Sequence, residues 1–221
     1  MAKLYIVATP IGNLEDITLR ALRILKEVDL IACEDTRVTK KLLDHYQITK
    51  PTISYHQHSK VEKIDFLVYK IKEGKSIALV SDAGTPGISD PGGLLVKAAA
   101  LSDIEIEVIP GPSALVSAVS ISGLALDKFI FYGFLPHKKG REKIIKEIIE
   151  GKMPVVFYES VHRIQKTLMQ LYEFGLGREI VVCRELTKVF ETVYRGSIKE
   201  VIKQLDEEQT RGEFVVIIDG K

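Results

Sequence analysis

The sequence predicts an α/β fold in two domains. Short runs rich in Ile, Val and Leu alternate with amphipathic helical stretches along most of the 221 residues. In the first half these apolar runs are almost continuous, which is typical of strands buried on both faces of a mainly parallel sheet. In the second half the last three runs are separated by short gaps, which predicts an antiparallel or mixed sheet. The short, stiff Pro110–Ser113 junction divides the two patterns, so we expect domains at residues 1–113 and 114–221 with a ligand cleft between them.

Each predicted strand is a run of four to seven mostly apolar residues. In the first domain the expected strands are Leu4–Ala8, Leu30–Cys33, Thr52–Tyr55, Ile77–Ser81 and Ile106–Ile109. In the second domain they are Lys128–Phe134, Val155–Tyr158, Ile180–Arg184, Val189–Tyr194 and Phe214–Ile218.

Helix starts are marked by capping residues. Ser59 with Glu62, and Ser197 with Glu200, have the spacing of capping boxes. Asp90 followed by Pro91 places a carboxylate at an N-cap and proline at the first helical position. Two further helices are expected in the second domain. They are Arg141–Ile149, in which Ile144, Ile145, Ile148 and Ile149 share one stripe, and Val161–Tyr172.

Composition excludes several classes of protein. With 31 basic and 30 acidic side chains the formal charge is +1, so the chain cannot hold nucleic acid by bulk charge and needs a local patch. Cys33 and Cys183 each lie in an apolar run, which indicates buried thiols and no disulfide framework. No apolar run approaches the roughly 20 residues that span a bilayer, and the first residues lack a signal-peptide pattern. We therefore expect a cytoplasmic, reduced protein that has no membrane contact.

Common nucleotide and metal motifs are incomplete. Gly74-Lys75-Ser76 lacks the upstream glycine of a phosphate-binding loop, because that position is Tyr69. The pair Gly175 and Gly177 lacks the third glycine of a dinucleotide fingerprint. His56 and His58 have no further ligands near them in the sequence, so a solvated loop is the default interpretation and no metal site is expected.

Three loops carry the strongest functional signal. Residues 81–93 hold four glycines and two prolines directly after the fourth predicted strand, more than an ordinary turn needs. Residues 8–13 follow the first strand and residues 110–114 follow the fifth. In open α/β sheets the carboxyl ends of the strands are where ligands bind, so we expect these loops to form one site.

The chain resembles the tetrapyrrole methylase superfamily and, within it, the ribosomal RNA small subunit methyltransferase I family. The resemblance runs from Leu4 to about Ile218, and the ordered set of motifs makes it specific. The motifs are ATPIGNLEDITLRAL (8–22), ACEDTR (32–37), SDAGTPGISDPG (81–92), IPGPSA (109–114), FYGFLP (131–136), FYESVHRI (157–164), RELTK (184–188) and GEFVVII (212–218). Corrin-type and siroheme-type relatives usually carry Gly-x-Gly-Pro-Gly-Asp in the first loop, so ATPIGN favours the ribosomal branch.

The resemblance implies a homodimeric enzyme that binds S-adenosylmethionine (SAM) between two α/β domains. It implies methylation of the ribose 2′-hydroxyl of a cytidine in the decoding region of 16S rRNA, in the small ribosomal subunit. The cofactor-binding positions that match are Pro10, Ile11, Asp82, Gly84, Thr85, Pro86, Ile88, Ser113, Ala114, Phe157, Leu186, Gly212, Glu213 and Phe214.

Methyl transfer to a ribose hydroxyl benefits from a base that takes the proton. Glu34 or Asp35, directly after the second strand, is a candidate base, and Arg37 is a candidate phosphate ligand. The alternative is that Asp35 or Thr36 only caps the following helix. Glu159 is the rival base, for which a capped helix with a solvated polar face is the alternative.

RNA contacts are expected from basic residues near these segments. The candidates are Arg37, Lys40, Lys138, Lys139, Arg141 and Arg163, of which three lie in the basic window from His137 to Lys146. A solvated helix face is the alternative for that window. Arg184, Glu185 and Lys188 form a third polar cluster, for which a structural ion-pair group is expected.

Two other functions remain open from the sequence alone. One is a tetrapyrrole C-methyltransferase, which would use the same cofactor site for a different acceptor. The other is a non-catalytic ribosome-binding factor that retains the fold.

Overall fold

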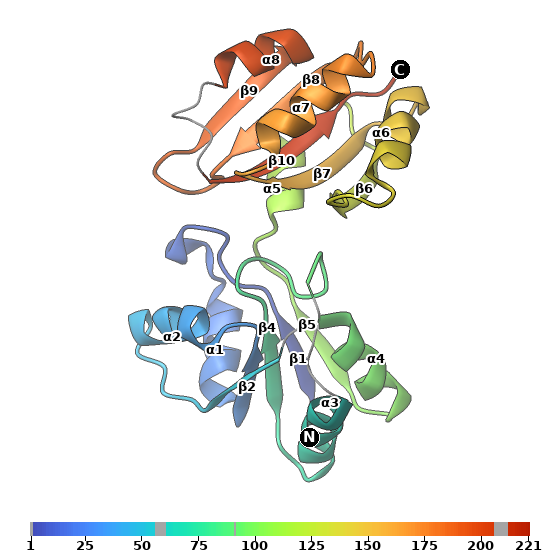
Figure 1. The fold of residues 1–221 in the computed structure, drawn as a ribbon. Helices are drawn as coiled ribbons and strands as arrows, with labels where there is room; N and C mark the ends of the chain where they lie inside the picture. The colour runs from blue at the N-terminus through green and yellow to red at the C-terminus, as the bar shows by residue number, and fades with distance from the viewer. Residues whose placement is uncertain (1, 56–60, 91, 206–211) are drawn as a thin grey trace. The chain divides into compact units, whose positions relative to one another are not determined.

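The computed structural model describes residues 2–55, 61–90, 92–205 and 212–221 (Figure 1). His56, His58, Ser59 and Pro91 lie outside the described residues, as do the predictions that depend on them. The chain divides into two compact units, Met1–Ser113 (unit 1) and Ala114–Lys221 (unit 2).

Unit 1 is built on a five-stranded sheet in which every neighbouring pair is parallel. Its strands are β1 (Leu4–Val7), β2 (Leu30–Cys33), β3 (Thr52–Ser54), β4 (Ile77–Val80) and β5 (Ile106–Ile109), in the order β3-β2-β4-β1-β5. The predicted parallel sheet is therefore confirmed. The central strands β1 and β4 are buried on both faces, whereas β5 lies at an edge and exposes Val108.

Helices cover both faces of this sheet (Figure 1). The helical elements are the 3-10 turn η1 (Leu14–Asp16), α1 (Leu19–Glu27), α2 (Thr36–His45), α3 (Val61–Lys72) and α4 (Gly92–Leu101). Alternate residues of β4 separate two apolar cores: Ala78 and Val80 pack with α1 and α2, whereas Ile77 and Leu79 pack with α3 and α4.

This layering places a crevice at the carboxyl ends of β1 and β4. The chain leaves β1 towards α1 on one face and leaves β4 towards α4 on the other face. Neighbouring parallel strands whose connections run to opposite faces form a topological switch point, which is where open α/β sheets bind ligands.

Unit 2 contains a mixed five-stranded sheet in the order β6-β7-β10-β8-β9. Its strands are β6 (Ile130–Phe134), β7 (Val155–Ser160), β8 (Glu179–Arg184), β9 (Thr192–Ser197) and β10 (Glu213–Ile218). Only the β6–β7 pair is parallel among these strands, so the predicted mixed sheet is confirmed.

The helices of unit 2 are α5 (Ala114–Ser122), α6 (Arg141–Glu150), α7 (Ile164–Glu173) and α8 (Ile198–Gln204). The last three share one apolar core, to which α6 contributes Ile145 and Ile148 as the predicted stripe requires. The Ser197–Glu200 capping box is present at the start of α8.

Several predicted boundaries in unit 2 differ from the structure, and two of them are wrong by a whole turn. Val189 and Phe190 read as strand residues, but turns occupy that segment and leave both side chains exposed, so β9 starts only at Thr192. Helix α7 starts at Ile164 rather than Val161, because the Arg163 N–H donates to Ser160 O and closes a turn first.

Both thiols are buried, as predicted. Burial raises the pKa of the Cys33 thiol and raises the pKa of Cys183 to about 11. None of the helices in the described part of the chain has the length and apolar character needed to cross a bilayer.

Candidate functional site

The loops that follow β1, β4 and β5 are joined by hydrogen bonds. Thr9 and Gly84 exchange two backbone hydrogen bonds, with N···O distances of 2.9 and 3.0 Å. The Thr9 hydroxyl donates to Ser81 O at 3.0 Å, and the Thr85 hydroxyl donates to Pro112 O at 3.1 Å. The three loops predicted to form one site in unit 1 are therefore fixed to one another.

Glycine is required where these loops touch. Gly84 has φ +80°, and a Cβ there would lie 3.3 Å from Ile11 Cγ2. A Cβ on Gly111 would lie 3.0 Å from the Ala8 Cβ. Because neither neighbour is a flexible side-chain tip, the loops approach this closely only with glycine at both positions.

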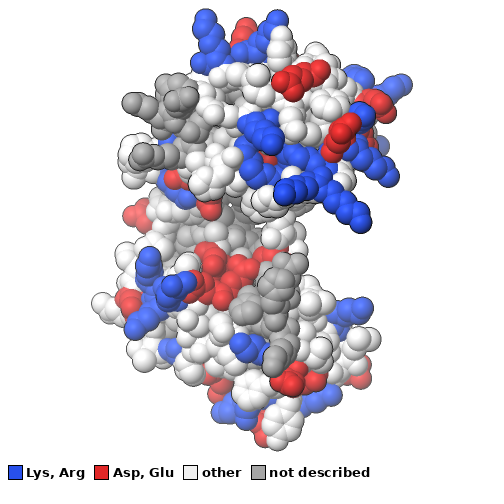
Figure 2. Space-filling model, in the orientation of Figure 1, with Lys and Arg blue, Asp and Glu red and all other residues white. Residues whose placement is uncertain are grey.

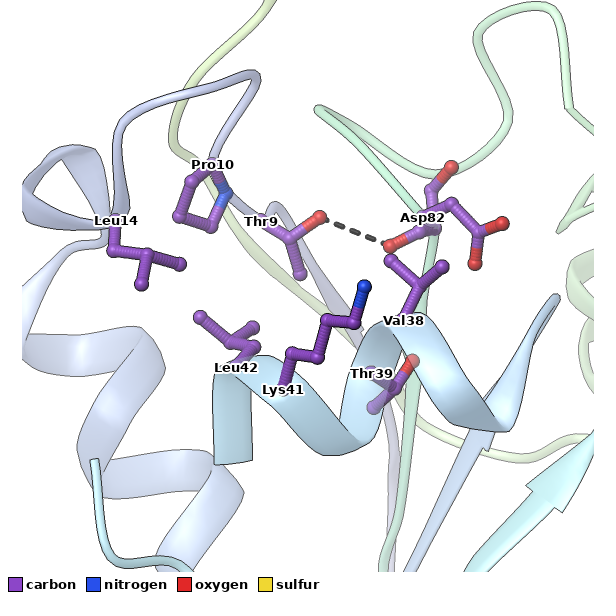
Figure 3. Close-up of a pocket in the computed structure, with 9 residues that line it drawn as sticks. Thr9, Pro10, Leu14, Val38, Thr39, Lys41, Leu42 and Asp82 are labelled. Atoms are coloured by element: carbon purple, nitrogen blue, oxygen red, sulfur yellow. Dashed lines mark hydrogen bonds between the residues drawn. The ribbon is translucent and has the colours of Figure 1, made fainter. Parts of the chain in front are cut away.

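A pocket of about 180 Å³ opens beside the β1 and β4 loops (Figure 3). Its walls are mainly apolar, and Lys41 and Asp82 supply the charged groups. Figure 3 shows the Lys41 side chain extending from α2 towards the ends of β1 and β4. The lining residues are Thr9, Pro10, Leu14, Val38, Thr39, Lys41, Leu42, Ser81 and Asp82.

Two neighbouring carboxyl groups at this edge have raised pKa values. Burial raises the pKa of Glu34, and the charges of Asp82 and Asp90 raise it further. The pKa of Asp82 is raised chiefly by burial, even though its Oδ1 accepts the Asp35 N–H at 3.0 Å. Figure 2 shows Asp and Glu side chains gathered on the visible face of unit 1. Acids perturbed in this way are typical of functional sites.

Asp35 differs from Glu34. It caps α2, since its Oδ1 accepts the Arg37 N–H at 2.8 Å, and it forms an ion pair with the Arg37 guanidinium at 2.6 Å. These bonds lower the pKa of Asp35 to about 2, which makes it a weak base. The capping alternative is therefore confirmed for Asp35. Arg37 and Lys40 remain exposed on α2.

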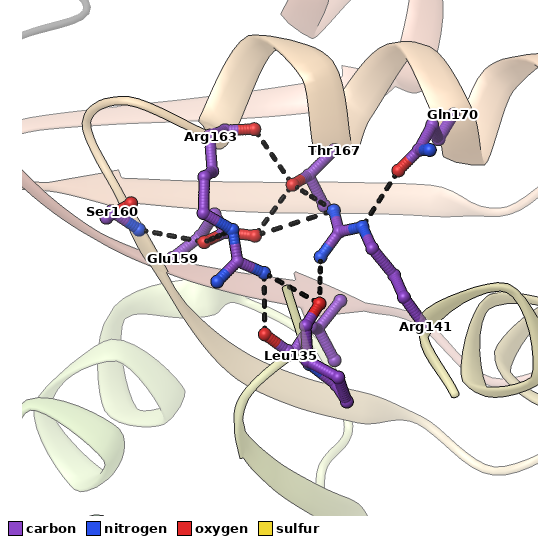
Figure 4. Close-up of polar contacts among 8 residues, drawn as sticks. Leu135, Arg141, Glu159, Ser160, Arg163, Thr167 and Gln170 are labelled. Carbon is purple, nitrogen blue, oxygen red and sulfur yellow. Dashed lines mark hydrogen bonds and ion pairs between the residues drawn. The ribbon is translucent and has the colours of Figure 1, made fainter. Parts of the chain in front are cut away.

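The structure corrects the roles expected for Glu159, Arg141 and Arg163. Glu159 follows Val155 and Phe157 on the core face of β7 and is 1% exposed. Its carboxylate lies 3.2 Å from Arg163 Nε, 3.7 Å from Arg141 Nη2 and 2.6 Å from the Thr167 hydroxyl (Figure 4). Because these groups satisfy one another inside unit 2, we assign Glu159 a structural role rather than that of the base. Neither arginine offers a free guanidinium to RNA.

The remaining candidates of unit 2 divide into core and loop residues. Phe157 and Phe214 are buried in the apolar core of unit 2. Lys188 Nζ lies 2.9 Å from Glu185 and 2.8 Å from Glu213, so the Glu185–Lys188 part of the predicted ion-pair group is confirmed and Glu213 joins it. Lys138 and Lys139 are exposed.

In unit 1 the structure brings most cofactor candidates to one place. Pro10, Ile11, Asp82, Gly84 and Thr85 all belong to the joined loops. Pro86 is buried, Ile88 is exposed and Ser113 ends the unit, while Ala114 begins α5.

Sequence reasoning missed three residues of this region. Thr9 ties the loops through its backbone and hydroxyl, and Thr39 and Lys41 line the pocket. For Thr39 and Lys41 a signal existed, because they lie three and five residues after Thr36, in the helix predicted to start directly after the second strand. For Thr9 the sequence offers no signal beyond its place in the loop.

Comparisons with known proteins agree with this geometry. The family model described as Tetrapyrrole (Corrin/Porphyrin) Methylases matches residues 3–202. A Thermotoga maritima protein named ribosomal RNA small subunit methyltransferase I is 46% identical over 221 residues, covering 100% of both chains. The protein of the same name from Mycoplasmopsis pulmonis is 49% identical over 218 residues, covering 98% of this chain and 97% of its own.

Solved structures of low sequence identity share the fold. A diphthine synthase superimposes with a TM-score of 0.77 at 14% identity, covering 99% of this chain and 90% of its own. A cobalamin biosynthetic enzyme, cobalt precorrin-4 methyltransferase, superimposes with a TM-score of 0.69 at 18% identity, covering 98% and 94%. Together with the matches above, the joined glycine loops place this chain in the tetrapyrrole methylase family and, within it, among the ribosomal RNA small subunit methyltransferase I proteins.

Proposed function

We propose that this chain is a SAM-dependent methyltransferase whose substrate is the RNA of the small ribosomal subunit. In its finer form the proposal is 2′-O-methylation of a decoding-region cytidine in 16S rRNA. Relatives that are 46–49% identical along nearly the whole chain carry the name ribosomal RNA small subunit methyltransferase I, which supports the RNA substrate.

The observation that carries the cofactor part is the junction of the three loops at the switch point of unit 1. Gly84 and Gly111 allow these loops to pack closely, and the Asp82 carboxylate beside them complements a sulfonium cation. When bound, SAM supplies a methyl group already activated on sulfur. The residues that we propose to hold it are Pro10, Ile11, Asp82, Gly84, Thr85, Pro86, Ile88 and Ser113, together with Ala114, Leu186, Gly212 and Glu213 of unit 2.

Glu34 is the base in this proposal. It takes the proton from the ribose 2′-hydroxyl as the new carbon–oxygen bond forms and the carbon–sulfur bond breaks. Its raised pKa makes it a stronger base than Asp35, whose pKa the Arg37 guanidinium holds at about 2. Arg37 and Lys40 lie beside it on α2 and contact RNA phosphates in the proposal.

Replacing Glu34 with glutamine is expected to lower kcat by about 10²–10⁴-fold, because the side chain keeps its shape but no longer accepts a proton. Wild-type kcat falls as pH drops through the pKa of Glu34. Since that pKa is raised, the acid limb lies above pH 4.5, the ordinary value of a glutamate, and it disappears in E34Q. Rates of methyl transfer measured from pH 4.5 to 8 test this.

The matched variant is D35N, which is expected to lose less activity because Asp35 caps a helix. Calorimetry should give E34Q the same SAM affinity as the wild type. A kcat for E34Q within twofold of wild type would remove Glu34 as the base.

The alternatives have weaker support. The support for tetrapyrrole C-methylation comes from solved structures that are 18–19% identical to this chain, and identity this low shows a shared fold alone. A non-catalytic ribosome-binding factor would not need the close loop junction of unit 1.

The deciding experiment incubates the protein with tritiated SAM and small subunits from cells that lack the enzyme. Label on ribose is expected, whereas label on a nucleobase would refute ribose chemistry. Turnover of uroporphyrinogen or a precorrin without RNA turnover would establish the tetrapyrrole alternative. An absence of SAM binding at millimolar cofactor in calorimetry would favour the binding factor.

Homodimer formation and a cytoplasmic location complete the proposal. Both are supported by the family resemblance, and a ribosomal substrate is found in the cytoplasm. Sedimentation velocity at micromolar protein should show a species of twice 24.7 kDa.

A further inference from the structure

One short segment of unit 2, residues 134–139, carries an exposed aromatic ring and two exposed lysines that the proposed reaction does not use. Phe134 ends β6 with its side chain 55% exposed. Its ring packs edge-on against Tyr158, with the ring centroids 5.5 Å apart and an interplanar angle of 61°. Tyr158 is itself fixed, because its hydroxyl accepts the Leu115 N–H at 3.1 Å. The Phe134 ring is therefore held at one edge and open to solvent elsewhere.

The two lysines follow this ring on a short turn. Lys138 and Lys139 are exposed, and the Arg141 N–H donates to Lys138 O at 3.2 Å, which closes the turn before α6. In the ranges that the structure describes, no carboxylate lies within ion-pair distance of either lysine. Lys and Arg side chains gather on the face of unit 2 visible in Figure 2. Both ammonium groups are therefore available to an anionic partner.

Between Phe134 and the lysines, the buried Arg141 and the partly buried Arg163 hold the backbone. Arg163 Nη2 donates to Leu135 O at 2.6 Å and to Pro136 O at 3.2 Å. Arg141 Nη1 donates to Pro136 O at 3.1 Å (Figure 4). Glu159 compensates the two charges, as described above. Burying charged groups costs free energy. In this unit the cluster fixes the backbone conformation of Leu135 and Pro136.

A held aromatic ring followed by unpaired lysines suits single-stranded RNA. Unpaired bases stack on aromatic side chains regardless of sequence, and lysines neutralise the phosphates between them. A loop that is already ordered loses little conformational entropy on binding. A protein with a net charge of only +1 needs a local surface of this kind.

We propose that Phe134, Lys138 and Lys139 form a binding surface for single-stranded nucleotides of the RNA substrate. Phe134 stacks on an unpaired base, and the lysines contact neighbouring phosphates. Arg141 and Arg163 are positioning residues that fix the backbone between them. The inference rests on the proposed RNA substrate and adds to it a place of contact.

The test compares F134A, F134W and the double variant K138A/K139A with wild type. The probes are a fluorescent oligocytidine, the same oligomer without bases, and small subunits from cells that lack the enzyme. F134A is expected to weaken binding of oligocytidine about tenfold and to leave binding of the abasic oligomer unchanged, while F134W keeps wild-type affinity. K138A/K139A should weaken the binding of both oligomers. It should also reduce the slope of the logarithm of the binding constant against the logarithm of the salt concentration by about 0.7 for each lost phosphate contact.

Matched controls come from α3 of unit 1. Tyr69 and Lys72 are also exposed, and Y69A and K72A are expected to bind all three probes like wild type. SAM affinity should be unchanged in every variant. If SAM binds and subunits are methylated but F134A keeps wild-type affinity for oligocytidine, the surface proposal is overturned and the proposed function stands. If F134A loses subunit binding alone, the surface contacts a ribosomal protein, which also overturns it.

The positioning role has a separate readout. R163M is expected to raise the KM for small subunits about tenfold while kcat and SAM affinity stay near wild type, measured well below its melting temperature. Adding F134A to R163M should then raise the KM for small subunits much less than F134A does alone, because the Phe134 ring is already displaced in R163M. Fully additive effects of the two substitutions would overturn the positioning role.

Discussion

Replacing Gly84 with alanine is expected to weaken SAM binding at least tenfold. Gly84 has φ +80°, where a non-glycine residue costs about 1–2 kcal/mol, and the new Cβ would press on Ile11 Cγ2 at 3.3 Å. The loop relieves this strain by leaving the position in which Gly84 pairs with Thr9. If the strain is relieved only when the loop leaves its binding conformation, the fraction of protein that can bind SAM falls about tenfold. The apparent Kd for SAM then rises by the same factor.

The matched variant for this prediction is G74A. Gly74 has φ +96°, but nothing lies within 4 Å of its added Cβ, and it precedes β4 at the opposite edge of the sheet. G74A should therefore lose a similar amount of stability without losing SAM affinity. Calorimetric titration of both variants separates the two effects. Equal SAM affinity in G84A and wild type would show that the joined loops do not hold the cofactor.

Glu159→Ala is expected to lower the free energy of unfolding of unit 2 by about 3–5 kcal/mol, because it leaves the buried Arg141 and the partly buried Arg163 without their counter-charge. Arg141 is 7% exposed, and burial followed by the charge of Arg163 already lowers the pKa of Arg141. Without Glu159 this repulsion is uncompensated. Denaturant unfolding followed by a probe in unit 2 measures the change.

The matched control for Glu159 is E142Q. Glu142 and Lys146 form a solvent-exposed i,i+4 ion pair at 2.8 Å, and such pairs contribute little to stability. E142Q should therefore leave the unfolding transition in place. A stable E159A protein with a large loss of kcat would contradict the structural role and restore Glu159 as a candidate base.

Most strands were predictable because their signal is local. β2 and β5 have the predicted bounds, since short apolar runs between polar turns define them. Val189 and Phe190 were mistaken for a strand because exposed apolar residues read the same as buried ones in a single sequence. The preceding Glu185 and Thr187 have positive φ, a backbone conformation that the local sequence does not predict.

The sequence predicted which loops form the candidate site, but it did not predict the role of each residue in them. Glu34 and Asp35 are adjacent in sequence, and the pKa of Glu34 is raised by its burial in the fold and then by the charges of Asp82 and Asp90, which lie far along the chain. The burial of Arg141 carried a signal that was overlooked. It precedes Ile144, Ile145 and Ile148 by three, four and seven residues, so it lies on the buried stripe of α6.

The burial of both native thiols has a practical consequence for labelling chemistry. Since the thiolate is the reactive form, Cys33 and the Cys183 thiol with its pKa of about 11 should react slowly with maleimides at neutral pH. A cysteine introduced at Lys139 would then be the fast-reacting group of the chain. A photo-crosslinker attached there would record which nucleotides of the ribosomal subunit pass within its reach, without first removing the natural cysteines.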